Sequence, residues 1–367
     1  MKQTKILRQA SEKLHNVNNS KHCLVGFDGF VDEIIHVVDK RKSAEEYERI
    51  SDMKALSERI ASVAGLSANI ELVPLQTKLG GNGPIMANAL IAQDNEVTYI
   101  GALGKHYIHP VFRDFAEICK DVISVTDPGF TEALEFYDGK LMLGKMNKLI
   151  EVSYEHLLEK LPEEDLKNLI GKVNLIAFTN WTMLFNLNSI IQNFSNIIKS
   201  QKHKPLVFLD LADPKKRTNE SIIEVLSIIS AIPTKTILSM NQSESSIIAS
   251  VLGIYEEELT ARALKIKERL EIYGIVIHPT QGAVIACENQ NIWFEGPYTS
   301  KPILTTGAGD NFNAGFCSAW MNGLEPAECL ATGVCSSGFY VRNARSAKRM
   351  ELLDFMDKWA DKDCGQI

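Results

Sequence analysis

A run of small residues ahead of an acidic residue is the strongest candidate site in the sequence. Residues Thr305–Phe316 read TTGAGDNFNAGF, and after Asp310 the apolar residues follow helical spacing. Glycines at the start of a helix leave backbone N–H groups open to an anion, and the helix dipole attracts negative charge. Gly307, Ala308 and Gly309 therefore form a candidate anion hole.

Asp310 beside this hole favours chemistry over simple anion binding. A carboxylate repels a resident phosphate, whereas one that accepts the proton of an attacking hydroxyl assists phosphoryl transfer. An ordinary aspartate cap at the start of a helix explains the same segment equally well.

Three other segments place polar residues where a ligand could meet them. Asp28 and Asp32 follow an apolar run, and carboxylates at the end of a strand can accept hydrogen bonds from sugar hydroxyls. A turn and a solvated helix start are the alternative. Gly80-Gly81 precedes a helical pattern that carries Asn82 and Asn88, whose amides would suit a polyol. A tight turn that leads into a core helix is the alternative there.

Asn241 and Glu244 follow another apolar run, in the order NQSE. An amide and a carboxylate at that place could hold a phosphate and a Mg²⁺-bound water. A helix capping box has the same pattern. The other glycine-rich motifs of nucleotide sites are missing from the sequence: no window fits GxxxxGK[ST], and neither Gly81–Met86 nor Gly307–Phe312 completes GxGxxG.

The elements that must position these residues alternate along the chain. Buried apolar runs predict strands, and stretches with helical spacing lie between several of them, which favours a doubly wound α/β fold with a mostly parallel sheet. The alternation on both sides of Asp138-Gly139 predicts a hairpin over Thr131–Lys145, and the charged stretch Lys40–Ser67 predicts surface helices. The runs assigned to strands are Cys23–Phe27, Val97–Ile100, Leu175–Phe178, Leu206–Leu211, Thr236–Met240 and Ile275–His278.

Composition indicates which classes of partner are not expected. The chain has 367 residues and a formal net charge of −7, so a nucleic-acid partner is not expected. Its 7 cysteines show no CxxC spacing, which indicates reduced thiols and a cytoplasmic protein. No apolar run is long enough for a membrane span, so no membrane partner is expected.

Taken in order, these motifs resemble the PfkB, or ribokinase-like, family of carbohydrate kinases over about Leu24–Ser346. The resemblance implies a three-layer α/β/α domain over residues 1–367, with lid elements near 28–38 and 131–145. It implies phosphorylation of a sugar or sugar-like alcohol by ATP with Mg²⁺, with Asp310 as the base and Gly307–Gly309 as the anion hole. The substrate contacts it implies are Asp28, Asp32, Gly80, Gly81, Asn82 and Asn88, and the ATP contacts are Asn241, Glu244, Thr280 and Gly282, with Glu244 near Mg²⁺ through water.

One departure, one further expected contact and two alternatives accompany the resemblance. Leu304 stands where the family commonly has an aspartate of a monovalent-cation site, which puts K⁺ activation in question. The basic residues of Asp210–Arg217 are expected near phosphate. The alternatives are a nucleoside kinase of the same family and a catalytically silent sugar-binding relative. A homodimer is compatible with the family, although the predicted hairpin shows no clear apolar seam.

Overall fold

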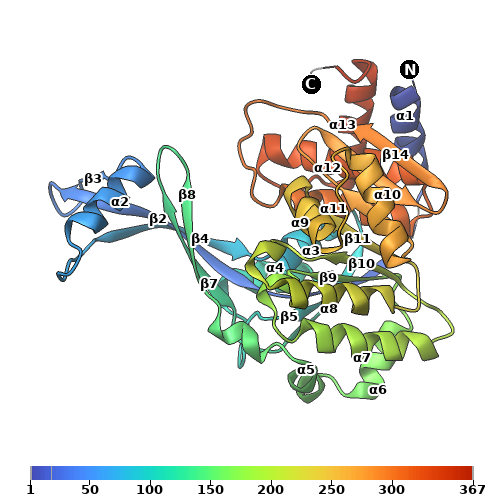
Figure 1. The fold of residues 1–367 in the computed structure, drawn as a ribbon, viewed down its shortest axis with the longest axis horizontal. Helices are drawn as coiled ribbons and strands as arrows, with labels where there is room; N and C mark the ends of the chain where they lie inside the picture. The colour runs from blue at the N-terminus through green and yellow to red at the C-terminus, as the bar shows by residue number, and fades with distance from the viewer. Residues whose placement is uncertain (1, 18, 366–367) are drawn as a thin grey trace.

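A large twisted sheet, with helices on both faces, makes up the body of the computed structural model, which describes residues 2–17 and 19–365 (Figure 1). Its strand order is β14-β13-β12-β11-β10-β9-β1-β5-β6, and neighbours are parallel from β12 to β6, whereas β13 and β14 are antiparallel. Every apolar run predicted to be a strand forms one, so the α/β fold is confirmed. The strands are β1 (His22–Phe27), β5 (Glu96–Gly101), β6 (Asp121–Ser124), β9 (Leu175–Thr179), β10 (Leu206–Asp210), β11 (Thr236–Met240), β12 (Gly274–Ile277), β13 (Gly282–Cys287) and β14 (Gln290–Glu295).

The helices form two layers because successive strand residues point to opposite faces. In β12, Val276 packs in one hydrophobic core, while Ile275 and Ile277 pack in the other. Among the described residues, no helix combines the length and apolar character needed to cross a membrane. The first layer holds α1 (Lys2–His15), α3 (Asn82–Ala92), α4 (Arg113–Ile118), α11 (Ala308–Met321), α12 (Pro326–Asn343) and α13 (Arg349–Asp361), and the second holds α5 (Tyr154–Lys160), α6 (Glu163–Ile170), α7 (Leu187–Ser200), α8 (Asn219–Ser230), α9 (Gln242–Val251) and α10 (Leu259–Leu270).

A second, smaller sheet projects from the body at the left of Figure 1, and we call it the lid sheet. β7 and β8 pair antiparallel and form the hairpin predicted around Asp138-Gly139. β2 is parallel to β7 on one side and antiparallel to β4 on the other. The strands are β2 (Phe30–Arg41), β3 (Tyr47–Arg49), β4 (Leu72–Gly80), β7 (Gly129–Glu135) and β8 (Lys140–Lys145).

The prediction of surface helices over Lys40–Ser67 is wrong for the first part of that stretch. Residues 40–41 continue β2, residues 47–49 form β3, and only α2 (Met53–Ser62) is helical. The charges that suggested a helix face instead pair along the lid: Arg41 with Glu71 and Lys42 with Glu48. Leu56 of α2 packs against residues of the lid sheet, and together they form a small hydrophobic core separate from those of the body.

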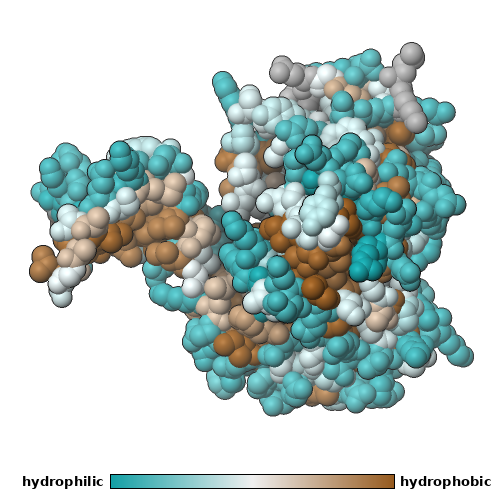
Figure 2. Space-filling view, in the orientation of Figure 1, coloured by the Kyte–Doolittle hydropathy of each residue, from teal (hydrophilic) through white to brown (hydrophobic). Residues whose placement is uncertain are grey.

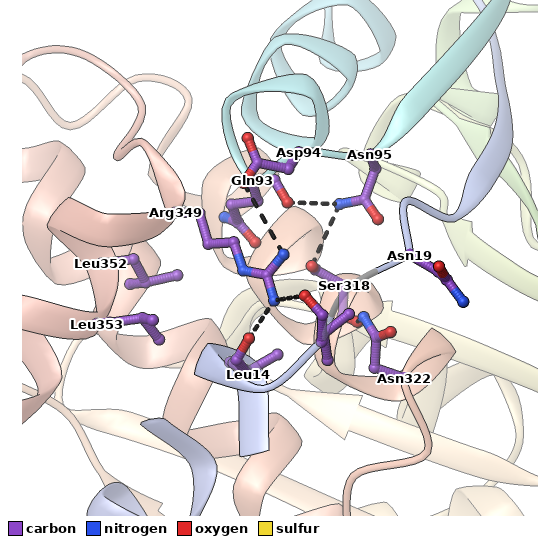
Figure 3. Close-up of a pocket in the computed structure, with 11 residues that line it drawn as sticks. Leu14, Asn19, Gln93, Asp94, Asn95, Ser318, Asn322, Arg349, Leu352 and Leu353 are labelled. Atoms are coloured by element: carbon purple, nitrogen blue, oxygen red, sulfur yellow. Dashed lines mark hydrogen bonds and ion pairs between the residues drawn. The ribbon is translucent and has the colours of Figure 1, made fainter. Parts of the chain in front are cut away.

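The two ends of the described chain are joined at the far side of the body, where α1 and α13 lie side by side (Figure 1). Arg349 donates hydrogen bonds to the carbonyl of Leu14, in the last turn of α1 (Figure 3), and to that of Val17, just past the helix end. At the same place Asn95 donates to Ser318, which ties the end of α3 to α11. The helices that carry the candidate site are therefore fixed at their far ends.

Candidate active site

The first turns of α3 and α11 meet at the carboxyl edge of the large sheet. Gly81, before α3, has a φ of 102°, and Gly307, before α11, has a φ of 92°, a conformation that favours glycine. Asn82 Nδ2 donates to Asp310 Oδ1 at 2.9 Å across 228 residues of sequence. The structure thus brings together two motifs that the sequence analysis treated separately.

Asp28 is fully buried beneath the start of α3. Its Oδ2 accepts from the Asn82 N–H at 3.0 Å and from Asn180 Nδ2 at 2.6 Å, and its Oδ1 accepts from the Gly83 N–H at 2.9 Å. Burial raises the pKa of Asp28, and these hydrogen bonds oppose the rise. Asp28 therefore anchors the α3 N-terminus, and the expected sugar contact does not follow from this placement.

Asp32 lies at the base of the lid sheet, opposite Lys78 and Thr131 on the neighbouring strands. Burial raises the pKa of Asp32, and a hydrogen bond from Thr131 opposes the rise. A Cβ on Gly80 would come within 2.4 Å of Asp32 Oδ2, so glycine is required for this carboxylate to sit there. Asn88, further along α3, makes no side-chain hydrogen bond to any described residue.

An acidic cavity of about 180 Å³ opens beside Asp310. Of the described residues that line it, four are carboxylates and none is lysine or arginine. Burial, followed by repulsion from Asp210, raises the pKa of Asp310 well above its usual range, while the Asn82 hydrogen bond opposes the rise. The lining consists of Asn82, Asp210, Ala212, Asp213, Asn241, Glu244, His278, Gly307, Gly309 and Asp310.

Asn241 and Glu244 form a capping box at the start of α9. Asn241 Oδ1 accepts from the Glu244 N–H at 3.0 Å, and Glu244 Oε2 accepts from the Asn241 N–H at 2.8 Å. Both side chains also line the acidic cavity, so the capping box does not exclude a role in the site. Burial and the neighbouring Asp210 raise the pKa of Glu244 to about 8.

A larger cavity of about 490 Å³ adjoins the acidic one and shares Asn241, His278 and Gly309 with it. Thr280 and Gly282, predicted to contact ATP, line it together with Ala308 of α11. Its walls are apolar on one side, where they would suit a planar base, and small near the start of α11, where they would suit phosphate. The apolar lining residues include Pro279, Pro297, Pro302, Ala308, Phe312, Val334 and Val341.

Several residues that line the cavities were not predicted as site residues, because their sequence signal was too weak. Asp210 and Asp213 were noted only as part of a stretch valued for its basic residues, yet they line the acidic cavity. Asp210 is held by Asn313 Nδ2 at 2.7 Å. His278 lines both cavities, and its Nε2 is buried with no hydrogen-bond partner in the described structure. The basic residues miss the acidic cavity, since Lys215 and Lys216 are exposed and Arg217 lines another.

The carboxylates of the acidic cavity do not form a metal site of their own. The described parts of the chain contain no group of three or more histidine, cysteine or acidic side chains placed to hold a metal ion. The carboxylates nevertheless repel one another, because Asp210, Asp213 and Asp310 all help to raise the pKa of Glu244. The cavity therefore fits a divalent cation that arrives with a phosphate ligand and meets the carboxylates through water.

Comparison with known proteins gives a consistent result. A family model described as prokaryotic ketohexokinase matches residues 2–359. A ketohexokinase from Haloferax volcanii is 26% identical over 344 residues, which cover 92% of this chain and 91% of that protein. The fold is shared with an Arabidopsis thaliana ribokinase solved with ribose and ATP (TM-score 0.67, 18% identity, 92% and 98% coverage) and with a nucleoside kinase from Methanocaldococcus jannaschii (0.63, 14%, 93% and 100%).

The raised pKa of Glu244 predicts a pH effect on stability. The folded state binds a proton at Glu244 that the unfolded state releases above its ordinary pKa of 4.5, so stability is lost as pH rises from about 4.5 to about 8. The variant Glu244→Gln has no ionisable side chain at this position, so it lacks this pH dependence. We expect the ligand-free wild type to lose more stability between pH 5 and pH 8 than the variant, by on the order of a few kcal/mol.

Urea unfolding of both proteins in matched buffers measures this difference. The comparison uses the change with pH rather than absolute stability, because glutamine also alters the capping box. Equal losses in the two proteins would show that Glu244 is already ionised at pH 5.

Proposed function

This chain belongs to the prokaryotic ketohexokinase family, and we propose that it transfers the γ-phosphoryl group of ATP to a hydroxyl of a ketohexose. The resemblance to PfkB carbohydrate kinases is confirmed, and the chain is an ATP-dependent sugar kinase. The observation that carries the residue assignment is the position of Asp310. Its carboxylate lies in the first turn of α11, where the two cavities adjoin, and it is oriented by Asn82.

Asp310 is the general base of the proposed reaction. Its raised pKa makes it a stronger proton acceptor than an ordinary carboxylate near neutral pH. The acceptor hydroxyl oxygen forms a bond to the γ-phosphorus as the bond to the ADP oxygen breaks. The hydroxyl proton passes to Asp310, and ADP leaves with the bonding electron pair.

The first turn of α11 stabilises the charge on the moving phosphoryl group. The N–H of Gly309 has no backbone partner among the described residues and lies at the positive end of the helix dipole, whereas the N–H of Ala308 donates to the carbonyl of Thr305 at 3.1 Å. A Cβ on Gly309 would lie 3.3 Å from His278 Cε1, so glycine keeps this approach open. The assignment of Gly307, Ala308 and Gly309 as the anion hole rests on these features.

Mg²⁺ would offset the negative charge of the acidic cavity. Glu244 and Asp213 are the side chains we assign to its water shell. When bound, the ion neutralises charge on the phosphates. The described lining of this cavity contains no lysine or arginine, and the bound cation would supply the positive charge in their place. We propose no role for K⁺, because Leu304 stands where the family commonly has an aspartate of a monovalent-cation site.

The acceptor would lie between the first turn of α3 and the base of the lid sheet. Asn82 and Asp32 offer an amide and a carboxylate, which suit sugar hydroxyls. Lid closure over this place would exclude water and favour transfer to the sugar over hydrolysis. Support for a ketohexose in particular comes from the family and from the Haloferax volcanii relative.

The surface of the lid supports a homodimer. Apolar side chains gather along one side of the lid sheet in Figure 2, and Leu141, Met142 and Leu143 of the edge strand β8 are all exposed. This apolar edge differs from the sequence expectation that the hairpin lacks such a seam. We also retain the cytoplasm as the proposed location, on the evidence of reduced cysteines.

Asp310→Asn tests the general base. The variant should lower kcat by about 10²- to 10⁴-fold, because asparagine cannot accept the proton, while ATP affinity changes little. A coupled ADP-release assay with ketohexoses, and equilibrium binding of ATP, measure the two effects. Asp354→Asn on the exposed face of α13 is the matched control and should leave both unchanged. A near-normal kcat for Asp310→Asn would refute the assignment.

Asp28 and Asp32 should respond differently to the same substitution. Asp28→Asn replaces one accepting oxygen with an NH₂ group that faces hydrogen-bond donors of the protein. The substitution should therefore lower the stability of the fold by about 1–3 kcal/mol. Asp32→Asn should lower kcat/KM for the sugar by about tenfold to a hundredfold, with little change in Tm. Thermal melts give the Tm of both variants, and kinetics with the sugar give their kcat/KM. A large loss of Tm in Asp32→Asn together with a loss of kcat/KM alone in Asp28→Asn would show that the two roles are exchanged.

A further inference from the structure

A third cavity lies on the helical face of the body, between α7 and α8. Its volume is about 350 Å³, within the range of about 300–1,000 Å³ that small-molecule sites occupy. Its lining shares no residue with the acidic cavity or the larger one. We call it the Arg217 cavity, and its lining consists of Phe185, Asn186, Asn188, Ser189, Gln192, Arg217, Ser221 and Glu224.

Arg217 is the unusual member of this lining. Its guanidinium carbon lies 4.5 Å from the ring centroid of Trp181 and 4.4 Å from that of Phe185. Its side chain makes no hydrogen bond or ion pair with any described residue, and its Nε is buried without a partner. Burial lowers the pKa of Arg217. An arginine fixed by two rings, with its donors unused, is prepared to bind an oxyanion.

The rest of the lining adds donors and favourable dipoles. Asn188 accepts from Trp181 Nε1 at 2.8 Å, which leaves its amide hydrogens for a ligand. α7 has 14 residues and begins at this cavity without a side-chain cap, whereas α8, which carries Ser221 in its first turn, is capped by Thr218 through the Ser221 N–H. The positive ends of two helix dipoles therefore accompany the arginine.

Glu224 favours a ligand that carries hydroxyl groups as well as an anionic group. It is the one carboxylate among the described lining residues and forms no ion pair with Arg217. A carboxylate repels phosphate but accepts hydrogen bonds well from hydroxyl groups. We propose that the Arg217 cavity binds a small polyhydroxylated molecule with one oxyanion group, that is, a sugar phosphate or a sugar acid. Its anionic group lies on Arg217, and its hydroxyls lie on Glu224 and the neighbouring amides.

Two chain segments connect the active site to the cavity, one through Arg217 of its lining and one through Trp181, which packs on Arg217. Arg217 ends the segment that begins with Asp210 and Asp213 in the acidic cavity, and Trp181 follows Asn180, which holds Asp28. The product of the proposed reaction is itself a sugar phosphate, so the product class fits this second site. That last link rests on the proposed function, whereas the binding site does not.

Equilibrium titrations of the full chain without ATP test the site and do not depend on turnover. The probes are glucose 6-phosphate, gluconate, inorganic phosphate and glucose, followed by calorimetry and by tryptophan fluorescence, since Trp181 contacts Arg217. We expect glucose 6-phosphate or gluconate to bind saturably and more tightly than phosphate or glucose. The stronger of the two identifies the phosphate or the carboxylate as the preferred group.

Three variants locate the binding. Arg217→Met should weaken the better probe at least tenfold, while Lys216→Met, its exposed neighbour, should not. Glu224→Gln should weaken glucose 6-phosphate but not inorganic phosphate, and this exposed residue can be changed even where Arg217→Met fails to fold. Absence of saturable binding, equal affinity in Glu224→Gln and wild type, or glucose binding as tightly as the anions would each overturn the proposal.

Discussion

The hydrogen bond from Asn82 to Asp310 requires two helices from opposite ends of the chain to begin at one point. α3 and α11 both start at the carboxyl edge of the large sheet, each after a glycine with positive φ. Asp28 fixes the first of them through two backbone N–H groups. The far ends are held as well, by the contact of Asn95 with Ser318. The parallel sheet and its helical layers can be understood as the frame that keeps this meeting point in place.

The electrostatics of the site follow from the same arrangement. Bringing the helix starts together buries several carboxylates close to one another, and their mutual repulsion adds to the effect of burial on Asp310 and Glu244. The pKa shift that makes Asp310 a competent base thus comes first from burial and then from the surplus of negative charge that a bound cation and the helix dipoles must offset. An acidic chain can therefore bind ATP although the described lining of the acidic cavity contains no lysine or arginine.

Much of this could be predicted from sequence because its signals are local. The buried strands, the Asp138-Gly139 hairpin and the glycine-rich start of α11 each depend on residues close together in the chain. The role of Asp28 could not be predicted, since its partners Asn82, Gly83 and Asn180 come from distant segments. Lys40–Ser67 misled for the related reason that its charges pair across the lid. Arg217 was expected near the phosphates, but its guanidinium packs on the rings of Trp181 and Phe185 and lines another cavity.

The dependence of kcat/KM on pH in the variant Asn82→Ala tests the central claim most directly. The Asn82 hydrogen bond favours the ionised form of Asp310, so its loss should raise the pKa of that carboxyl further. Activity requires the ionised base, and the acidic limb of the profile should therefore move to higher pH than in the wild type. An acidic limb at the same pH in both proteins would contradict the account, because Asn82 would then not act on the base.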